Sequence, residues 1–225
     1  MQKDRAYTDE RVANSAEDTE ENREMQLVLE YRSLRAFAPS GVYTIPTIQD
    51  IYKWYGLVFI RGGEYQGAIF KFCLDIPTDY PYSCPKVYFL SHVFHPLVCP
   101  DSGQLNLSPG FPSWRPRKDF IFLVLSYLKT IFHCKDYWKD SKNVQNLNAS
   151  LLFQNDEDQF LREVRTCVMA SLDDLQDSAD DFPIRLKGFN SFHKKVLDEV
   201  RNGEKVATVP EQSEAFMNWF RKTFI

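Results

Sequence analysis

The chain has no long apolar run. No stretch of it approaches the roughly 18 consecutive apolar residues that a membrane-spanning helix requires. The first residues are charged, whereas a secretory signal peptide carries an apolar segment there. These two absences predict a cytoplasmic protein without a transmembrane segment.

Cysteine is scarce, and its number and spacing argue against a disulfide framework and against a zinc ribbon. The five cysteines form an odd set without a Cys-x-x-Cys pair, which favours reduced thiols over a disulfide framework or a zinc ribbon. They are Cys73, Cys84, Cys99, Cys134 and Cys167. A metal site built from His92, His95 and Cys99 would lack a fourth ligand at a recognisable spacing. We therefore expect neither a metal nor another cofactor.

An excess of positive charge is also absent. Residues 1–24 hold eight acidic and four basic side chains, and their net of −4 equals the formal net charge of the whole 225-residue chain. The remainder is charge-balanced, which argues against a nucleic-acid-binding groove. With few apolar residues to bury, residues 1–19 are predicted to be an acidic flexible tail.

The first half of the chain alternates in a way that predicts one helix and four strands. From Glu20 to Ala38, apolar residues recur at helical spacing, and Pro39 to Gly41 then provide a stop. Four segments rich in β-branched and aromatic residues follow, with turn residues between them. These segments are Val42–Ile45, Tyr55–Ile60, Ala68–Ile76 and Val87–Leu90.

The second half predicts helices. Asp119 is a candidate N-cap for an apolar helix over Phe120–Phe132, expected to be the central helix against the sheet. Further helical patterns cover Gln145–Gln154, Asp156–Leu175 and Ser191–Asn202. The predicted fold class is α+β, with an N-terminal helix, a four-stranded antiparallel meander and C-terminal helices.

One motif dominates the middle of the chain. The segment FKFCLDIPTDYPYSCPKVYFLSHVFHP (70–96) continues into HPLVCPDSGQLNLSPGFPSWRP (95–116). This pattern resembles the ubiquitin-conjugating (UBC) family, which places His-Pro-Asn eight residues before its nucleophilic Cys, and then a Trp followed closely by a Pro. His95, Pro96, Trp114 and Pro116 match that pattern. The resemblance implies a UBC-like fold over residues 20–202.

The two chemical positions of the motif depart from the family. Leu97 replaces the Asn that would hydrogen-bond the developing oxyanion, and Leu105 replaces the Cys. Carrying ubiquitin as a thioester requires a thiolate, which is both the nucleophile and the next leaving group. Losing one oxyanion donor costs about 2.7–4 kcal/mol of barrier in other enzymes. We therefore expect a degenerate pocket of His95, Pro96, Leu97, Leu105 and Trp114, and no enzyme activity.

Within the family, the chain resembles the inactive variants of the Fused-toes/crossbronx type. The segment FHPLVCPDSGQLNLS and the strand opening Trp54-Tyr55-Gly56 carry this resemblance. It implies a pseudoenzyme adaptor in vesicle and endosome transport, bound to Hook-type coiled-coil proteins and other subunits of an adaptor complex and peripheral at vesicle membranes through these partners. The alternative is a non-catalytic regulator that binds ubiquitin or an active conjugating enzyme. A third hypothesis is an active enzyme that uses Cys99, six positions before Leu105.

Other polar residues around the motif have structural interpretations. Ser102 and Ser108 flank the pocket, but no Ser-His-Asp arrangement is visible, so we interpret them as loop residues. The acidic run from Asp173 to Asp181 lacks the Asp-x-Asp-x-Asp-Gly pattern of a calcium loop and is interpreted as a solvated helix end.

Residues 203–225 are predicted to form a C-terminal extension. Phe216, Trp219, Phe220 and Phe224 would line one face of a helix over Ser213–Ile225. This face could fold back on the domain or bind a partner protein. Arg221 and Lys222 beside it leave a membrane-surface role open as a third interpretation.

Overall fold

The structure is a computed structural model that describes residues 21–139, 142–175 and 182–184. All of these residues belong to one compact unit of the chain, residues 1–184. The predicted tail at 1–19, the predicted helix over Ser191–Asn202 and the predicted extension at 203–225 lie outside the described residues.

The first described element is a helix over residues 21–37. Its inward side carries Leu27 and Leu34, which are buried, and Tyr31, whose ring packs edge-on against Trp54 at 5.4 Å between centroids. These three residues are spaced by four and three positions, so they share one side of the helix. The amphipathic helix was predicted, and its apolar side packs against the sheet.

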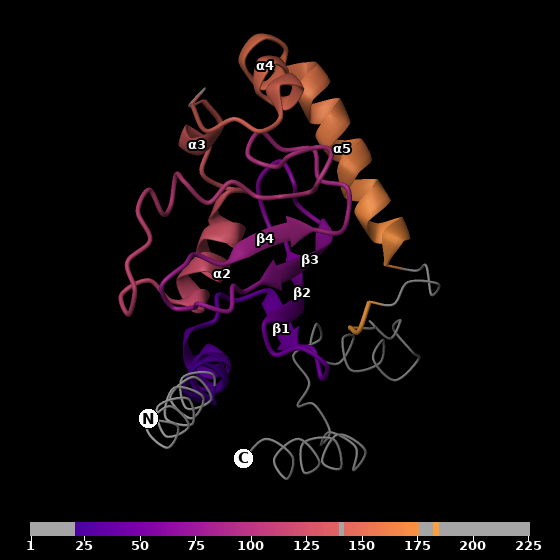
Figure 1. The fold of residues 1–225 in the computed structure, drawn as a ribbon. Coiled ribbons are helices and arrows are strands. Elements are labelled where there is room, and N and C mark those ends of the chain that lie inside the picture. The colour runs from indigo at the N-terminus through magenta and orange to yellow at the C-terminus, as the bar shows by residue number, and fades with distance from the viewer. Residues whose placement is uncertain (1–20, 140–141, 176–181, 185–225) are drawn as a thin grey trace, which may run out of the picture. The chain divides into compact units, whose positions relative to one another are not determined.

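The sheet is a four-stranded antiparallel meander in the order β1-β2-β3-β4 (Figure 1). Its strands are β1 (Val42–Pro46), β2 (Lys53–Phe59), β3 (Ile69–Asp75) and β4 (Lys86–Phe89). Gly56 of β2 pairs with Phe72 of β3, and a Cβ at Gly56 would lie 2.3 Å from the Phe72 ring. The missing side chain at Gly56 thus gives the Phe72 ring its place in the core.

The helices after the sheet are α2 (Ile121–Thr130), α3 (Asp136–Lys139), α4 (Leu147–Asn155) and α5 (Glu157–Asp174). Together with the first helix and the sheet, they give the predicted α+β UBC-like order. Just after α2, the Phe132 ring stacks on Phe70 of β3 at 5.3 Å between centroids and meets Phe89 of β4 edge-on. This aromatic contact joins the central helix to the sheet. The short helix α3 was not predicted.

Two helices begin with capping residues close to the predicted boundaries. The Asn146 side chain accepts the N–H of Ala149 at the start of α4, and Asp156 accepts that of Gln159 at the start of α5. Each oxygen satisfies one of the N–H groups that a helix leaves unpaired at its first turn. These caps explain why α4 and α5 are separate helices.

The end of α5 is attached to the sheet through Asp174, which corrects the interpretation of the acidic run as a solvated helix end at that residue, while Asp173 is exposed as expected. The Lys71 ammonium, on β3, lies 3.1 Å from the Asp174 carboxylate, which also accepts the Ser91 hydroxyl at 2.8 Å. Lys71 is buried, and its ammonium lies over the Phe182 ring at 5.5 Å. A buried ammonium needs a paired anion, and Asp174 supplies it. Asp177, Asp180 and Asp181 lie outside the described residues.

Candidate functional site

His95, the first residue of the degenerate motif, is fully buried and hydrogen-bonded at both ring nitrogens. Its Nδ1 accepts the N–H of Leu97 at 3.0 Å, so its Nε2, 3.1 Å from the carbonyl of Ile131, donates there. The ring lies 5.4 Å from Trp138 and 5.5 Å from Phe132, between centroids. Burial lowers the pKa of His95 to about 3. His95 therefore holds one neutral tautomer that ties the motif to the residue after α2.

The structure brings the two leucines of the motif onto neighbouring segments. Val98 and Leu105 form an antiparallel bridge, and the N–H of Asn106 donates to the carbonyl of Leu97 at 2.9 Å. Leu97 is 0% exposed and Leu105 is 2% exposed, and both belong to the main hydrophobic core. Position 105 thus carries an apolar side chain that solvent does not reach.

The backbone of position 105 is attached to the edge of β4. The N–H of Leu105 donates to Val87 at 2.9 Å, and the N–H of Phe89 donates to Gly103 at 2.8 Å. Gly103 has a φ of +70°, and a Cβ there would lie 2.2 Å from the Phe89 carbonyl oxygen. Only glycine combines that backbone conformation with so close an approach. Sequence analysis did not identify Gly103 as a site residue, although a glycine in a short loop is a usable signal.

Hydrogen bonds also fix Asn106, the residue after Leu105. The Tyr127 hydroxyl donates to the carbonyl of Asn106 at 3.1 Å, and the Asn106 side-chain amide donates to the carbonyl of Asn143 at 2.8 Å. Burial raises the pKa of Tyr127, which therefore keeps its proton at neutral pH. Sequence analysis missed these residues because Tyr127 and Asn143 are 21 and 37 positions from Asn106.

Cys99, the alternative nucleophile, lies at the start of the turn before Leu105. Its backbone N–H donates to Gln104, and the N–H of Gly103 donates back to its carbonyl, each at 2.9 Å. A hydrogen bond from the Ser102 side chain, with further bonds from the N–H groups of Ser102 and Asp101, lowers the pKa of the Cys99 thiol. This thiol is half-buried at the surface and six residues before the position that the family uses.

The residues considered as metal ligands do not form a ligand set. Both nitrogens of His95 are engaged, while His92 is exposed. In the described part of the chain, no three His, Cys, Asp or Glu residues are grouped as metal ligands would be. Ser102 accepts the N–H of Gln104 within the turn, and the N–H of Ser108 donates to the Asn106 side chain. Both serines thus take part in loop hydrogen bonds.

Trp114 anchors the segment after the pocket. Its indole N–H donates to the carbonyl of Pro81 at 2.7 Å, and its ring lies 5.6 Å from Phe111 and 6.2 Å from Tyr80, between centroids. These contacts tie the chain after Leu105 to the loop between β3 and β4. The Trp of the motif is therefore a packing residue in this structure.

Asp119 does not cap α2, so that prediction was wrong. Its carboxylate accepts the backbone N–H and the guanidinium of Arg115, with 2.6 Å to Nη2, and these bonds lower its pKa. The N-cap residue is Phe120, whose side chain makes no capping bond. Glu30 of the first helix takes the capping role instead, because its Oε2 accepts the N–H of Ile121 at 2.8 Å.

Among the described residues no helix is both long and apolar enough to cross a membrane.

The structure does not describe the predicted C-terminal extension. The predicted partner-binding residues lie outside the described part of the chain. They are Phe216, Trp219, Phe220 and Phe224.

The sequence family is decided by comparison with known proteins. The family model described as ubiquitin-conjugating enzyme matches residues 26–168, which include most of the first helix, the sheet and the whole degenerate motif. The chain belongs to the ubiquitin-conjugating enzyme family. Within this family it belongs with variants of the crossbronx and AKT-interacting protein type, the Fused-toes type expected from the motif.

Three relatives illustrate the placement within the UBC family. The chain is 31% identical over 211 residues to Protein crossbronx homolog of Culex quinquefasciatus, which covers 88% of this chain and 89% of the relative. It is 36% identical to Protein AKTIP homolog of Nematostella vectensis and 35% identical to AKT-interacting protein of Pongo abelii, over 80% and 77% of this chain. It spans 59% and 58% of the length of those two UBC relatives.

Proposed function

We propose that this chain is a non-catalytic UBC-fold adaptor subunit that acts in vesicle and endosome trafficking in a complex with Hook-type coiled-coil proteins. The observation that carries the non-catalytic part is the environment of Leu105. Its side chain is 2% exposed and its backbone is bonded to β4. An aliphatic group in that place supplies neither a nucleophile nor a leaving group.

The residues around position 105 support the same proposal. Leu97 has no side-chain donor for an oxyanion, and its own N–H is already bonded to His95. The hydrogen bonds from Tyr127 to Asn106 and from Asn106 to Asn143 fix the residue after Leu105 in place. The Leu97 side chain and N–H thus offer a transferred acyl group no free hydrogen-bond donor, and the Leu105 side chain offers it no nucleophile.

The outer surface of the first helix supports a protein-binding role. Met25 is 59% exposed, and Leu29, four residues later, is 56% exposed. Two large apolar side chains on one exposed side of a helix are typical of a surface that contacts another protein.

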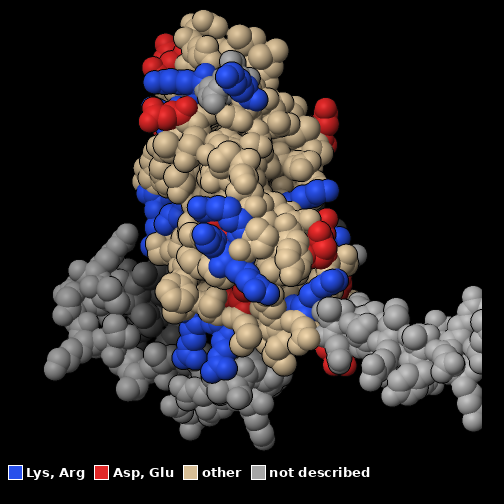
Figure 2. Space-filling view, turned by 60° about the vertical axis from the view of Figure 1, so that its left-hand side comes forward, with Lys and Arg blue, Asp and Glu red and all other residues tan. Residues whose placement is uncertain are grey.

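Figure 2 shows Lys and Arg side chains gathered on the middle and lower parts of one face, where Asp and Glu are few. Such a face would favour a partner of opposite charge.

The choice of partner rests on family resemblance. One relative is named AKT-interacting protein and another AKTIP homolog, and the first of these names refers to a protein partner. Hook-type coiled-coil proteins and vesicle transport come from the resemblance to the Fused-toes type, and a shared fold alone does not determine function.

Affinity purification of the tagged full-length protein from its own cells, followed by mass spectrometry, tests this function. We expect a long coiled-coil protein of the Hook type at stoichiometric yield, without enzymes of ubiquitination. Stoichiometric recovery of ubiquitin or an active conjugating enzyme, with no coiled-coil protein, would instead support the regulatory alternative. Recovery of AKT alone would overturn the trafficking proposal and leave the adaptor function.

A further inference from the structure

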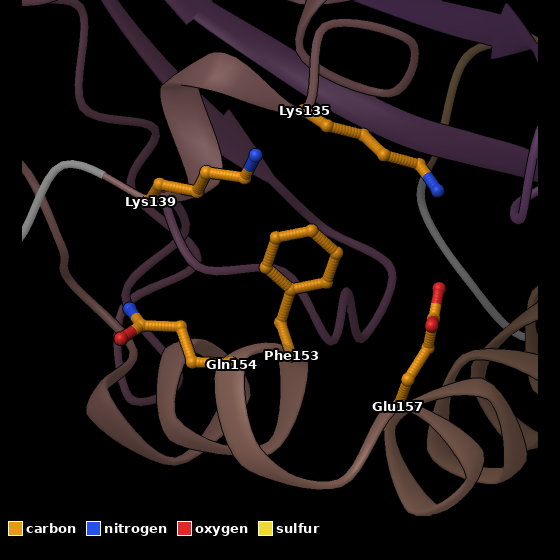
Figure 3. Close-up of a pocket in the computed structure, with 5 residues that line it drawn as sticks. All are labelled: Lys135, Lys139, Phe153, Gln154 and Glu157. Atoms are coloured by element: carbon orange, nitrogen blue, oxygen red, sulfur yellow. The ribbon is translucent and has the colours of Figure 1, made fainter.

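A pocket of about 420 Å³ lies where α3, α4 and the start of α5 meet, outside the degenerate motif. It is lined by Lys135, Lys139, Phe153, Gln154 and Glu157 (Figure 3). Pockets of this size fall in the range that holds a ligand or an anchoring side chain.

The Phe153 ring lines the pocket and packs against two aromatic side chains of the core. It lies 5.0 Å from Trp138 and 5.3 Å from Phe160, between centroids, and both of those residues are fully buried. Phe153 itself is only half-buried. One side of a rigid aromatic ring therefore remains available to an incoming apolar side chain.

The two ends of the pocket carry opposite charges. Figure 3 shows Lys139 and Glu157 on opposite sides of the Phe153 ring. Lys135 also lines the pocket, but its ammonium forms a salt bridge with Glu64. Among the residues that the structure describes, neither Lys139 nor Glu157 has an ion-pair partner, and both are exposed. The pocket thus offers one available cation and one available anion with an apolar surface between them.

The outer side of α4 extends the apolar part of this surface. Leu147 is 67% exposed and Leu151 is 48% exposed. They are four residues apart on α4, and Gln154 follows three residues after Leu151, so the three share one side of the helix. This stripe leads along α4 to the pocket.

We propose that the α4 stripe and this pocket form a docking site for an amphipathic helix of a partner protein. The helix would direct an acidic side chain to Lys139, an apolar one onto Phe153 and a basic one to Glu157. Coiled-coil helices carry such mixed charges on both sides of an apolar seam. The proposal deepens the adaptor function, because it gives that function a binding surface on the described domain.

Three helix-stapled peptides of equal length test the site on the full-length chain. They differ only in the flanking charges along one face: acidic-Leu-basic, acidic-Leu-acidic and basic-Leu-basic. Amide chemical shifts give the binding site and Kd. We expect shifts at Lys139, Phe153, Gln154 and Glu157, and tightest binding by the mixed peptide, whereas replacing its central Leu by Ser should abolish binding.

Charge substitutions in the protein then give the decisive comparison. Lys139→Glu should make the basic-Leu-basic peptide the tightest ligand, and Glu157→Lys should favour the acidic-Leu-acidic peptide. The double variant should prefer the mixed peptide again, since a helix can bind in either direction. Each preference should amount to about two- to fivefold in Kd, the range of one exposed ion pair. Both positions are exposed, so the variants should keep the wild-type thermal midpoint.

The proposed docking site is wrong if the wild type, the two single variants and the double variant all bind the three peptides in the same order of affinity. It is also wrong if millimolar peptide shifts the amide signals of none of the pocket residues. The proposed trafficking function fails separately. If the peptides behave as expected but no coiled-coil protein co-purifies with the wild-type chain, the docking site stands and the trafficking proposal falls. If the co-purified coiled-coil protein binds the wild type, Lys139→Glu and Glu157→Lys with the same measured Kd, the docking site is wrong and the adaptor function stands.

Discussion

Glu30 of the first helix caps α2 through Ile121, across 91 positions of sequence. Its Oε2 accepts the Ile121 N–H at 2.8 Å, and its Oε1 accepts the Tyr80 hydroxyl. The carboxylate is 7% exposed. One buried side chain therefore joins the first helix, the central helix and the loop that contains Tyr80.

Replacing Glu30 by Ala should destabilise the protein by about 2–4 kcal/mol, because it leaves two buried donors without an acceptor. Urea unfolding measures the loss. Glu24→Ala is the matched control, since Glu24 is an exposed glutamate on the same helix and should change stability by less than about 0.5 kcal/mol. Equal effects of the two substitutions would contradict the capping role.

The stability that Glu30 contributes should depend on pH. Burial is the largest influence on Glu30 and raises its pKa above the ordinary 4.5, although the bonds from Tyr80 and Ile121 act against this. The folded state therefore binds the proton more tightly than the unfolded state, and this contribution is lost as pH rises from 4.5 through the folded pKa. Unfolding free energies at several pH values should show wild type losing stability relative to Glu30→Gln over that window. A difference independent of pH would contradict the raised pKa.

Removing one partner of the Lys71–Asp174 pair should destabilise the end of α5. Asp174→Ala leaves the buried Lys71 ammonium without its carboxylate, and we expect a loss of about 1–3 kcal/mol, below the value for a fully buried pair because Asp174 is 35% exposed. The double variant Lys71→Met with Asp174→Ala should recover part of this loss. A double-mutant cycle by chemical unfolding measures the coupling, and additive losses would show that the pair does not interact.

Gly103→Ala should prevent the turn before Leu105 from holding its position. The substitution requires a side chain at a φ of +70° and places a Cβ against the Phe89 carbonyl, so we expect a loss of about 3 kcal/mol or more. Gly62→Ala is the control, because a Cβ at Gly62 meets no atom within 4 Å. Thermal unfolding compares the two variants, and similar midpoints would contradict the close attachment of this turn to β4.

His95 should remain neutral across the physiological range. Its folded pKa of about 3 lies below the ordinary 6.5, so its contribution to stability is present above pH 6.5 and is lost as pH falls toward 3. Nitrogen chemical shifts of the ring should show the Nε2–H tautomer unchanged from about pH 8 to about pH 5. A titration of His95 with a midpoint near 6.5 would mean that the ring is hydrated, contrary to the structure.

Local sequence patterns predicted most of the fold. Ala68–Ile76 was predicted as a strand and β3 covers Ile69–Asp75, because β-branched and aromatic residues fill this segment between turn residues. Asp156–Leu175 was predicted as a helix, and α5 covers Glu157–Asp174 with Asp156 as its cap. Both predictions depended only on residues close together in the sequence.

Most of the features that the sequence did not predict depend on distant contacts, but the Asp119–Arg115 pair is local. Glu30 lies on the inward side of the first helix, three residues after Leu27, and this placement was the one available sign of a buried carboxylate. Asp119 satisfies the local pattern of an N-cap but binds Arg115 instead. The spacing of His95, Leu97 and Leu105 indicated the degenerate motif, whereas the hydrogen bond from Tyr127 that fixes Asn106 beside it spans 21 positions.

A thioester assay tests the central claim most directly. Purified full-length protein would be incubated with ubiquitin-activating enzyme, ATP and ubiquitin, beside Cys99→Ser and an active conjugating enzyme as positive control. The non-catalytic account predicts no ubiquitin adduct that a reducing agent removes, with either protein, while the positive control is charged. A reducible adduct on the wild-type chain that disappears in Cys99→Ser would contradict the account and make Cys99 the nucleophile of an active enzyme.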